Sequence, residues 1–168
     1  GEISRDDKSI ITIFENQIRV SDAEEGYLKY APIEFPEEVF KVVLSPDGKF
    51  FAAFNLGEGK VKSQVRFYDI ETGKEIFSPV FLNCKLYDAH IYNFSKHIIL
   101  EGDVKQMWDI TTGKPASAPE PYSKSSVKTS FRHNSNEFVI LKNYKLYLDR
   151  FVTFQEILDH YRGSKQMQ

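Results

Sequence analysis

The chain has 168 residues, of which 41% are hydrophobic and 27% are charged, so it is neither a disordered tail nor a membrane protein. The net charge of −2 argues against a general nucleic-acid binder, which normally carries a basic excess. Aromatic residues are unusually common at 14%, and they favour sheets because flat rings pack well on a pleated surface.

Aspartates recur along the chain, each at the end of an apolar segment. They are Asp22, Asp69, Asp109 and Asp149, with gaps of 47, 40 and 40 residues. The two clearest copies share the order aromatic, Asp, Ile, any residue, Thr, Gly, Lys, and the aromatic residue of the second copy is Trp108. One active site needs only one copy, so the repetition indicates a structural role. We expect each carboxylate to accept backbone N–H groups of the turn that follows it.

A second mark precedes each aspartate and predicts a tight turn between two strands. The best copy begins at Ser45-Pro46, where Pro46 presets φ, Asp47 caps the turn and Gly48 accepts a positive φ. Weaker copies occupy residues 3–8, 93–96 and 131–136. Strands are expected after these turns, at Ile10–Phe14, Phe50–Phe54, His97–Leu100 and Phe138–Leu141.

Each unit therefore reads as four short antiparallel strands in about 40 residues, which is typical of a propeller blade. The units lie at about 1–30, 31–76, 77–116 and 117–150 and together make up a propeller region over 1–150. The first unit begins at its own turn and lacks its opening strands. We therefore expect an all-β chain with about three and a half to four blades, the C-terminal part of a larger propeller. The polar start without an initiating Met carries no signal peptide and favours a protein that begins earlier.

The segments 45–49 and 108–114 resemble the WD-repeat family of β-propellers, and the resemblance covers roughly residues 3–150. It implies a WD-repeat-like β-propeller fold. The Thr-Gly-Lys stretch with a later Pro looks like repeats found behind signalling NTPase or kinase modules in bacterial proteins. Only one unit keeps the Trp-Asp pair, and the Gly-His pair of the family is missing. The hydrogen-bonded network that this His forms in the family is therefore not carried over.

The last part of the chain, 151–168, differs from the repeats and predicts a short helix at about 154–162. Thr153 and Glu156 fit a capping box at its start. An apolar stripe at helical spacing follows, formed by Phe154, Ile157, Leu158 and Tyr161. The alternative interpretation is an outer strand at Phe151–Leu158.

No motif in the sequence predicts catalysis, a cofactor or a metal site. The segment 57–60 (Gly-Glu-Gly-Lys) lacks the first glycine and the final Ser or Thr of a phosphate loop, so we interpret it as a flexible hairpin tip. The histidines form no metal-ligand doublet, and Cys84 has no cysteine partner. The pairs Glu24-Glu25 and Glu37-Glu38 fall in predicted turns, where carboxylates are usually solvated. The single cysteine fits a reducing compartment, cytoplasmic or otherwise intracellular.

Alternating strand direction predicts that the Ser-Pro-Asp-Gly-like turns and the aspartate loops lie on one face of the ring. Loops presented by a rigid scaffold are where binding usually resides. We therefore expect a non-catalytic protein-interaction scaffold or sensor that binds protein partners or the remaining blades, without nucleic acid or membrane. The expected partner-binding residues are Glu71, Thr72, Lys74, Thr111, Lys114, Arg132, His133 and Asn134.

Two other hypotheses remain open. The chain could instead be the regulatory or substrate-gating propeller domain of a larger enzyme, with the catalytic module outside these residues. It could also be a half propeller in which two copies complete one ring as a homo-oligomer. A longer reading frame with a catalytic module would support the first of these hypotheses. A stable monomer in solution would exclude the second.

Overall fold

The computed structural model describes residues 1–4, 6–92, 95–121, 128–131, 137–142 and 145–150, and the chain divides into two compact units. The first unit is Gly1–Tyr122 and the second is Ser123–Gln168. The predicted C-terminal helix at 154–162 lies outside the described residues, as do Arg132, His133 and Asn134. The side chain of Asp149 also lies outside the described part.

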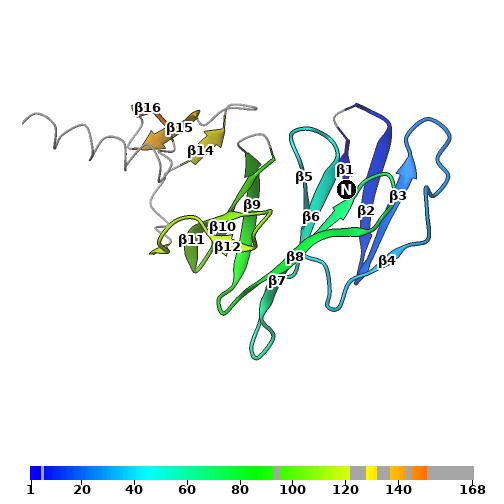
Figure 1. Ribbon diagram of the computed structural model, residues 1–168, viewed down its shortest axis with the longest axis horizontal. Helices are drawn as coiled ribbons and strands as arrows, with labels where there is room; N and C mark the ends of the chain where they lie inside the picture. Colours follow the sequence, from blue (N-terminus) through cyan, green and yellow to red (C-terminus); the bar gives the residue numbers. More distant parts are fainter. Residues whose placement is uncertain (5, 93–94, 122–127, 132–136, 143–144, 151–168) are drawn as a thin grey trace, which may run out of the picture. The chain divides into compact units, whose positions relative to one another are not determined.

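The described chain is all-β, and the first unit holds three antiparallel sheets built on a four-strand pattern (Figure 1). The first sheet has the order β1-β2-β3-β4, with bounds Glu2–Ile3, Ser9–Phe14, Gln17–Asp22 and Ile33–Glu34. The second has the order β5-β6-β7-β8, with bounds Lys41–Leu44, Phe50–Phe54, Ser63–Asp69 and Glu75–Leu82.

The third sheet has the order β9-β10-β11-β12, with bounds Leu86–Tyr92, His97–Gly102, Val104–Asp109 and Lys114–Pro115. A further short strand, β13 (Glu120–Pro121), pairs with the other end of β11, so β12 and β13 share the fourth position. The second unit contains a three-stranded sheet in the order β14-β15-β16, with bounds Lys128–Phe131, Glu137–Lys142 and Lys145–Arg150.

The predicted strands agree with this pattern. The strand expected at 50–54 is β6, and those expected at 10–14, 97–100 and 138–141 are β2, β10 and β15, each one or two residues longer. The prediction that the first unit lacks its opening strands is wrong, because Glu2–Ile3 pairs with β2 as β1. Two residues are too few to show a periodic pattern in the sequence, which is why this strand was missed.

A serine closes the turn between the first two strands of the first and second sheets. The Ser45 N–H donates to the Phe50 carbonyl over 2.9 Å, and the Phe50 N–H donates to Ser45 Oγ over 3.0 Å. Ser4 and Ser9 repeat both bonds at 2.8 Å. Gly48 has a φ of 71°, which glycine adopts without strain. The serine hydroxyl oxygen therefore takes the place of one backbone carbonyl acceptor between the two strands.

The repeated aspartates cap the turn after the third strand, as expected for Asp22, Asp69 and Asp109. Asp69 Oδ1 accepts the Thr72 N–H over 2.8 Å and the Thr72 hydroxyl over 2.7 Å. Asp109 Oδ1 accepts the Thr112 N–H over 2.9 Å, and Asp22 Oδ1 accepts the N–H groups of residues 24 and 25 over 2.9 Å. These bonds hold the pKa of Asp22 below its ordinary value.

The two kinds of turn lie at the same end of each sheet, as the alternation of strand direction predicted; the ring face to which the prediction also assigned them stays a prediction. The residue after each aspartate donates its N–H to the carbonyl of a lysine in the first turn of the same sheet. The pairs are Ala23 to Lys8 at 2.9 Å, Ile70 to Lys49 at 3.0 Å and Ile110 to Lys96 at 2.9 Å. We call this the turn end of the sheets. The opposite end carries the β2–β3 and β6–β7 hairpins, and we call it the hairpin end.

The second sheet is the centre of the first unit because both faces of β6 are buried. One face packs toward the first sheet in a cluster that includes Phe51, Ala53, Ile11, Ile18 and Val20. The other face packs toward the third sheet in a cluster that includes Phe50, Ala52, Phe54, Ile98 and Leu100. Small alanines alternating with large rings let the sheets approach on both sides.

Neighbouring sheets are also joined at defined points. Their first strands contact one another in order, β1 with β5 and β5 with β9. Between the last two, Lys41 Nζ lies 2.7 Å from Asp88 Oδ1. At the turn end, the Tyr30 ring covers Gly73, where an added Cβ would lie 2.5 Å from a ring carbon. The aspartate turn of the second sheet is thus covered by the chain leaving the first.

The Gly73→Ala substitution tests this contact, with Gly26→Ala as the matched control. Both glycines end an aspartate turn with positive φ, 67° and 76°, but no atom lies within 4 Å of a Cβ at Gly26. Strain alone costs about 1–2 kcal/mol, and the overlap with Tyr30 adds about 1–3 kcal/mol. In urea unfolding, Gly73→Ala should lose at least about 1 kcal/mol more than Gly26→Ala. Equal losses would contradict the contact.

The Asp88→Asn substitution should have a pH-dependent effect. Burial pushes the pKa of Asp88 up, but hydrogen bonds from Lys41 and the Ala89 N–H outweigh it, so the pKa lies below its ordinary value. The stabilisation is therefore present above about pH 4 and is lost as pH falls through the folded pKa. Both side chains are over one third exposed, so screening limits the effect to about 0.5–1 kcal/mol at pH 7. Urea unfolding at pH 7 and pH 3 measures it; a pH-independent difference would refute the ion pair.

Candidate functional site: a groove at the hairpin end

The predicted partner-binding residues of the first unit lie at the turn end, where several are used to hold the turns. The hydroxyls of Thr72 and Thr111 donate to Asp69 and Asp109, each over 2.7 Å. Glu71 Oε1 lies 2.8 Å from Lys29 Nζ of the first sheet. The side chains of Lys74 and Lys114 are exposed. Three of these five side chains, those of Thr72, Thr111 and Glu71, are therefore already paired within the chain.

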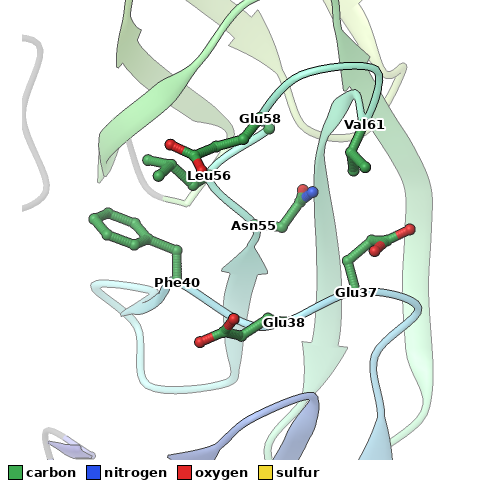
Figure 2. Close-up of a pocket in the computed structure, with 8 residues that line it drawn as sticks. Glu37, Glu38, Phe40, Asn55, Leu56, Glu58 and Val61 are labelled. Carbon is green, nitrogen blue, oxygen red and sulfur yellow. The ribbon is translucent and has the colours of Figure 1, made fainter.

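A hollow lies instead at the hairpin end, where two segments far apart in the sequence meet (Figure 2). One is the connection that enters β5, and the other is the β6–β7 hairpin. The hollow has a volume of about 240 Å³ and is lined by Glu37, Glu38, Phe40, Asn55, Leu56, Gly57, Glu58 and Val61. We call it the groove.

The connection into β5 is held by backbone bonds on both sides. The Val39 N–H donates to the Glu15 carbonyl of the β2–β3 hairpin over 2.9 Å, and the Phe40 N–H donates to the Phe54 carbonyl over 2.8 Å. Val39 is buried between these bonds, while Glu37, Glu38 and Phe40 are exposed. This wall of the groove is thus fixed to the first and second sheets at once.

The hairpin wall is held by buried polar side chains. Asn55 is 3% exposed; its Oδ1 accepts the Gln64 N–H over 2.6 Å and its Nδ2 donates to the Lys62 carbonyl over 3.1 Å. At Gly57, with a φ of 71°, a Cβ would overlap the Ser63 side chain. The Leu56 carbonyl accepts the Leu86 N–H of β9 over 3.0 Å. The segment interpreted from sequence as a flexible tip is therefore anchored at its base.

The groove combines apolar surface with negative charge. Phe40 is 48% exposed, and its ring centroid lies 6.0 Å from that of Phe54; Val61 is 43% exposed. Among the described residues, Glu37 and Glu38 have no hydrogen-bond or ion-pair partner, whereas Glu58 Oε1 lies 3.0 Å from Lys85 Nζ. Figure 2 shows Phe40, Leu56 and Glu58 on one side of the hollow, Val61 and Glu37 on the other, and Glu38 at the edge between them. Such a surface suits an amphipathic cationic group.

A second hollow, of about 310 Å³, shares Gly57 and Val61 with the groove but carries the opposite charge. Its other lining residues are Gly59, Lys60, Lys62, Asn83, Cys84, Lys85 and Asp103. Asp103 organises one side of it, accepting the Lys85 N–H over 2.9 Å and the Tyr87 hydroxyl over 3.2 Å. We call it the basic hollow. The β6–β7 hairpin therefore separates an acidic from a basic surface.

The described residues hold neither a cluster of metal ligands nor a membrane-spanning helix. Within them, no group of three His, Cys, Asp or Glu side chains is placed to hold a metal ion. No helix in the described ranges has the length and apolar character needed to cross a membrane. Of the histidines, His97 stacks on Tyr92 with ring centroids 5.7 Å apart, and burial lowers its pKa.

Comparison with known proteins adds no assignment. No protein-family model matches the chain, and no curated protein sequence matches it. The assignment of the groove as a candidate site therefore depends on the residues of this chain alone.

Sequence reasoning missed the groove. It interpreted the pair Glu37-Glu38 as solvated turn residues and the 57–60 segment as a hairpin tip. Both lie in loops, but their convergence depends on the register of β5, β6 and β7. One feature of the sequence could have indicated the groove. Phe40, a large aromatic residue, lies two residues after the pair Glu37-Glu38 and directly before the apolar strand.

Cys84 offers a direct check of packing in the basic hollow. The residue packs against the core cluster between the second and third sheets, and burial raises the pKa of its thiol. Because only the thiolate reacts, Cys84 should react with iodoacetamide at pH 8 several-fold more slowly in the folded chain than in the urea-unfolded chain. Mass spectrometry of timed samples measures both rates. Equal rates would contradict the partial burial of the thiol and its raised pKa.

Proposed function

We propose that the first unit forms blades of a β-propeller resembling WD-repeat proteins. Three sheets with the same strand order follow one another, and their first strands contact in sequence. The serine turn recurs in the first and second sheets and the aspartate cap in all three, and sheet stacks on sheet through opposite faces of β6. Radial repetition of four-stranded sheets is the propeller architecture.

One open sheet face supports a propeller that continues beyond these three blades. In each sheet the second strand has one residue that pairs with the repeated aspartate, and the residues that follow it, Ile10, Phe51 and Ile98, are therefore equivalent. Phe51 and Ile98 are 0% exposed and pack toward the preceding sheet. On the matching face of the first sheet, Ile3 is 59% and Phe14 is 62% exposed. This face would accept a further blade, supplied by the same protein or by a second copy of the chain.

We propose that the chain acts as a non-catalytic protein-interaction scaffold or sensor, inside the cell, without a cofactor, nucleic acid or membrane. The observation that carries this proposal is the groove, an anchored hollow with an exposed aromatic ring and two carboxylates that have no partner among the described residues. Exposed aromatic residues beside polar groups are typical of protein-binding surfaces. The face proposed for binding is therefore the hairpin end, rather than the turn end favoured by the sequence.

The alternative function is that of a regulatory or substrate-gating propeller within a larger enzyme. The open face of the first sheet favours it, because a further blade joined to a catalytic module would cover Ile3 and Phe14. The two proposals share the same groove and differ in whether the bound partner is a separate chain.

Photo-crosslinking tests the scaffold proposal. A benzoylphenylalanine would replace Phe40 at the groove or, as the control, Tyr27, which is 55% exposed and lies in the loop after Asp22 at the turn end. In cells of the source organism, we expect position 40 to give a discrete protein adduct that position 27 does not. Adducts at position 27 alone would place binding at the turn end. Absence of adducts at both positions would contradict a scaffold function.

A further inference from the structure

We infer that the groove receives a cationic side chain, arginine or lysine, presented beside an apolar residue by the partner protein. This inference rests on the proposed scaffold function and specifies the chemistry of what the groove binds. It is carried by the size of the groove, its charge and the arrangement of its apolar surface.

The volume of the groove sets the size of the ligand. Pockets for drug-sized molecules are roughly 300–1,000 Å³ and enclose most of the ligand. At about 240 Å³ the groove is smaller, and it lies between two loops at the hairpin end. It therefore suits one or two side chains of a larger partner, rather than a complete small molecule.

The charge of the groove sets the sign of the ligand. Three of its eight lining residues are glutamates, and none is a lysine, arginine or histidine. Lys85 pairs with Glu58, but Glu37 and Glu38 have no partner among the described residues. The nearby Lys60 and Lys62 line the basic hollow instead. A cation entering the groove could thus pair with a glutamate carboxylate without breaking an ion pair among the described residues.

The apolar residues select the form of the cation. Leu56 and Val61 offer surface to the aliphatic stem of an arginine or lysine, which such side chains bury while their charge stays near water. The Phe40 ring is half exposed, so a guanidinium or ammonium group could lie over its face. A simple inorganic cation would use neither of these surfaces.

The walls of the groove are already in place, which reduces the cost of binding. Asn55 and Gly57 hold the hairpin wall, and the bonds of Val39 and Phe40 hold the other. Since the lining backbone is fixed by bonds to three sheets, little ordering is needed when a side chain enters.

Capped tetrapeptides of sequence Gly-Leu-Arg-Gly, Gly-Leu-Lys-Gly and Gly-Leu-citrulline-Gly would test the inference. Their binding to the isotope-labelled chain is followed by NMR at the amides of Phe40, Leu56 and Val61. Citrulline keeps the shape of arginine without its charge. We expect one or both cationic peptides to bind at least fivefold more tightly than the citrulline peptide, with weaker binding at high salt.

Paired substitutions locate the binding. The double variant E37Q/E38Q should weaken binding of the cationic peptides about five- to tenfold. The matched control is E24Q/E25Q, an exposed glutamate pair in the aspartate turn of the first sheet, outside the groove. It should leave binding unchanged. Phe40→Leu keeps the apolar cover, removes the ring and should weaken binding severalfold.

Equal losses in the two glutamate variants would overturn the inference, since binding would then follow net charge alone. No binding of either cationic peptide, or equal binding of the citrulline peptide, would also overturn it. The result is separable from the scaffold proposal: a protein adduct at position 40 together with no peptide binding would leave the scaffold function standing while the cationic ligand fails. No adduct at either position would remove the scaffold function itself, even if the peptides bound.

Discussion

The first unit depends on a backbone bond that recurs in all three of its sheets. In each, the N–H after the repeated aspartate donates to a lysine carbonyl of the first turn, at 2.9–3.0 Å. The donor residues are Ala23, Ile70 and Ile110, so the bond tolerates different side chains. Together with the aspartate cap it closes one end of the sheet, because both turns are held in contact. The opposite end is left free to differ from sheet to sheet.

This division also separates polar groups that are paired within the fold from charged groups that have no partner among the described residues. At the turn end, Thr72 and Thr111 bond to the aspartates, and Glu71 pairs with Lys29. At the hairpin end, Glu37 and Glu38 are exposed without partners in the described part of the chain. Polar groups already paired within the fold offer little to a partner, whereas unpaired charges beside an exposed ring offer both attraction and contact area.

Stacking of sheets through β6 has a second consequence. The first sheet packs on one face of the second. The chain that leaves the first sheet after β4 therefore crosses to the second sheet before β5 begins. The crossing segment is held between the Glu15 and Phe54 carbonyls, and this places Glu37, Glu38 and Phe40 against the β6–β7 hairpin. The groove is therefore a product of how the first and second sheets are joined.

Strand positions, serine turns and aspartate caps could be predicted from the sequence because each depends on residues within about ten positions of one another. Phe50–Phe54 and the turn at Ser45 are examples. The groove could not, since Glu37 and Val61 belong to segments brought together by strand register and by bonds such as that from the Phe40 N–H to the Phe54 carbonyl. Whether a carboxylate is paired, and whether a ring such as Phe40 is buried or exposed, depends on neighbours distant in the chain. Local chemistry thus specified the repeated sheets, and tertiary packing decided that the exposed Phe40 ring and the two glutamates meet in a hollow at the hairpin end.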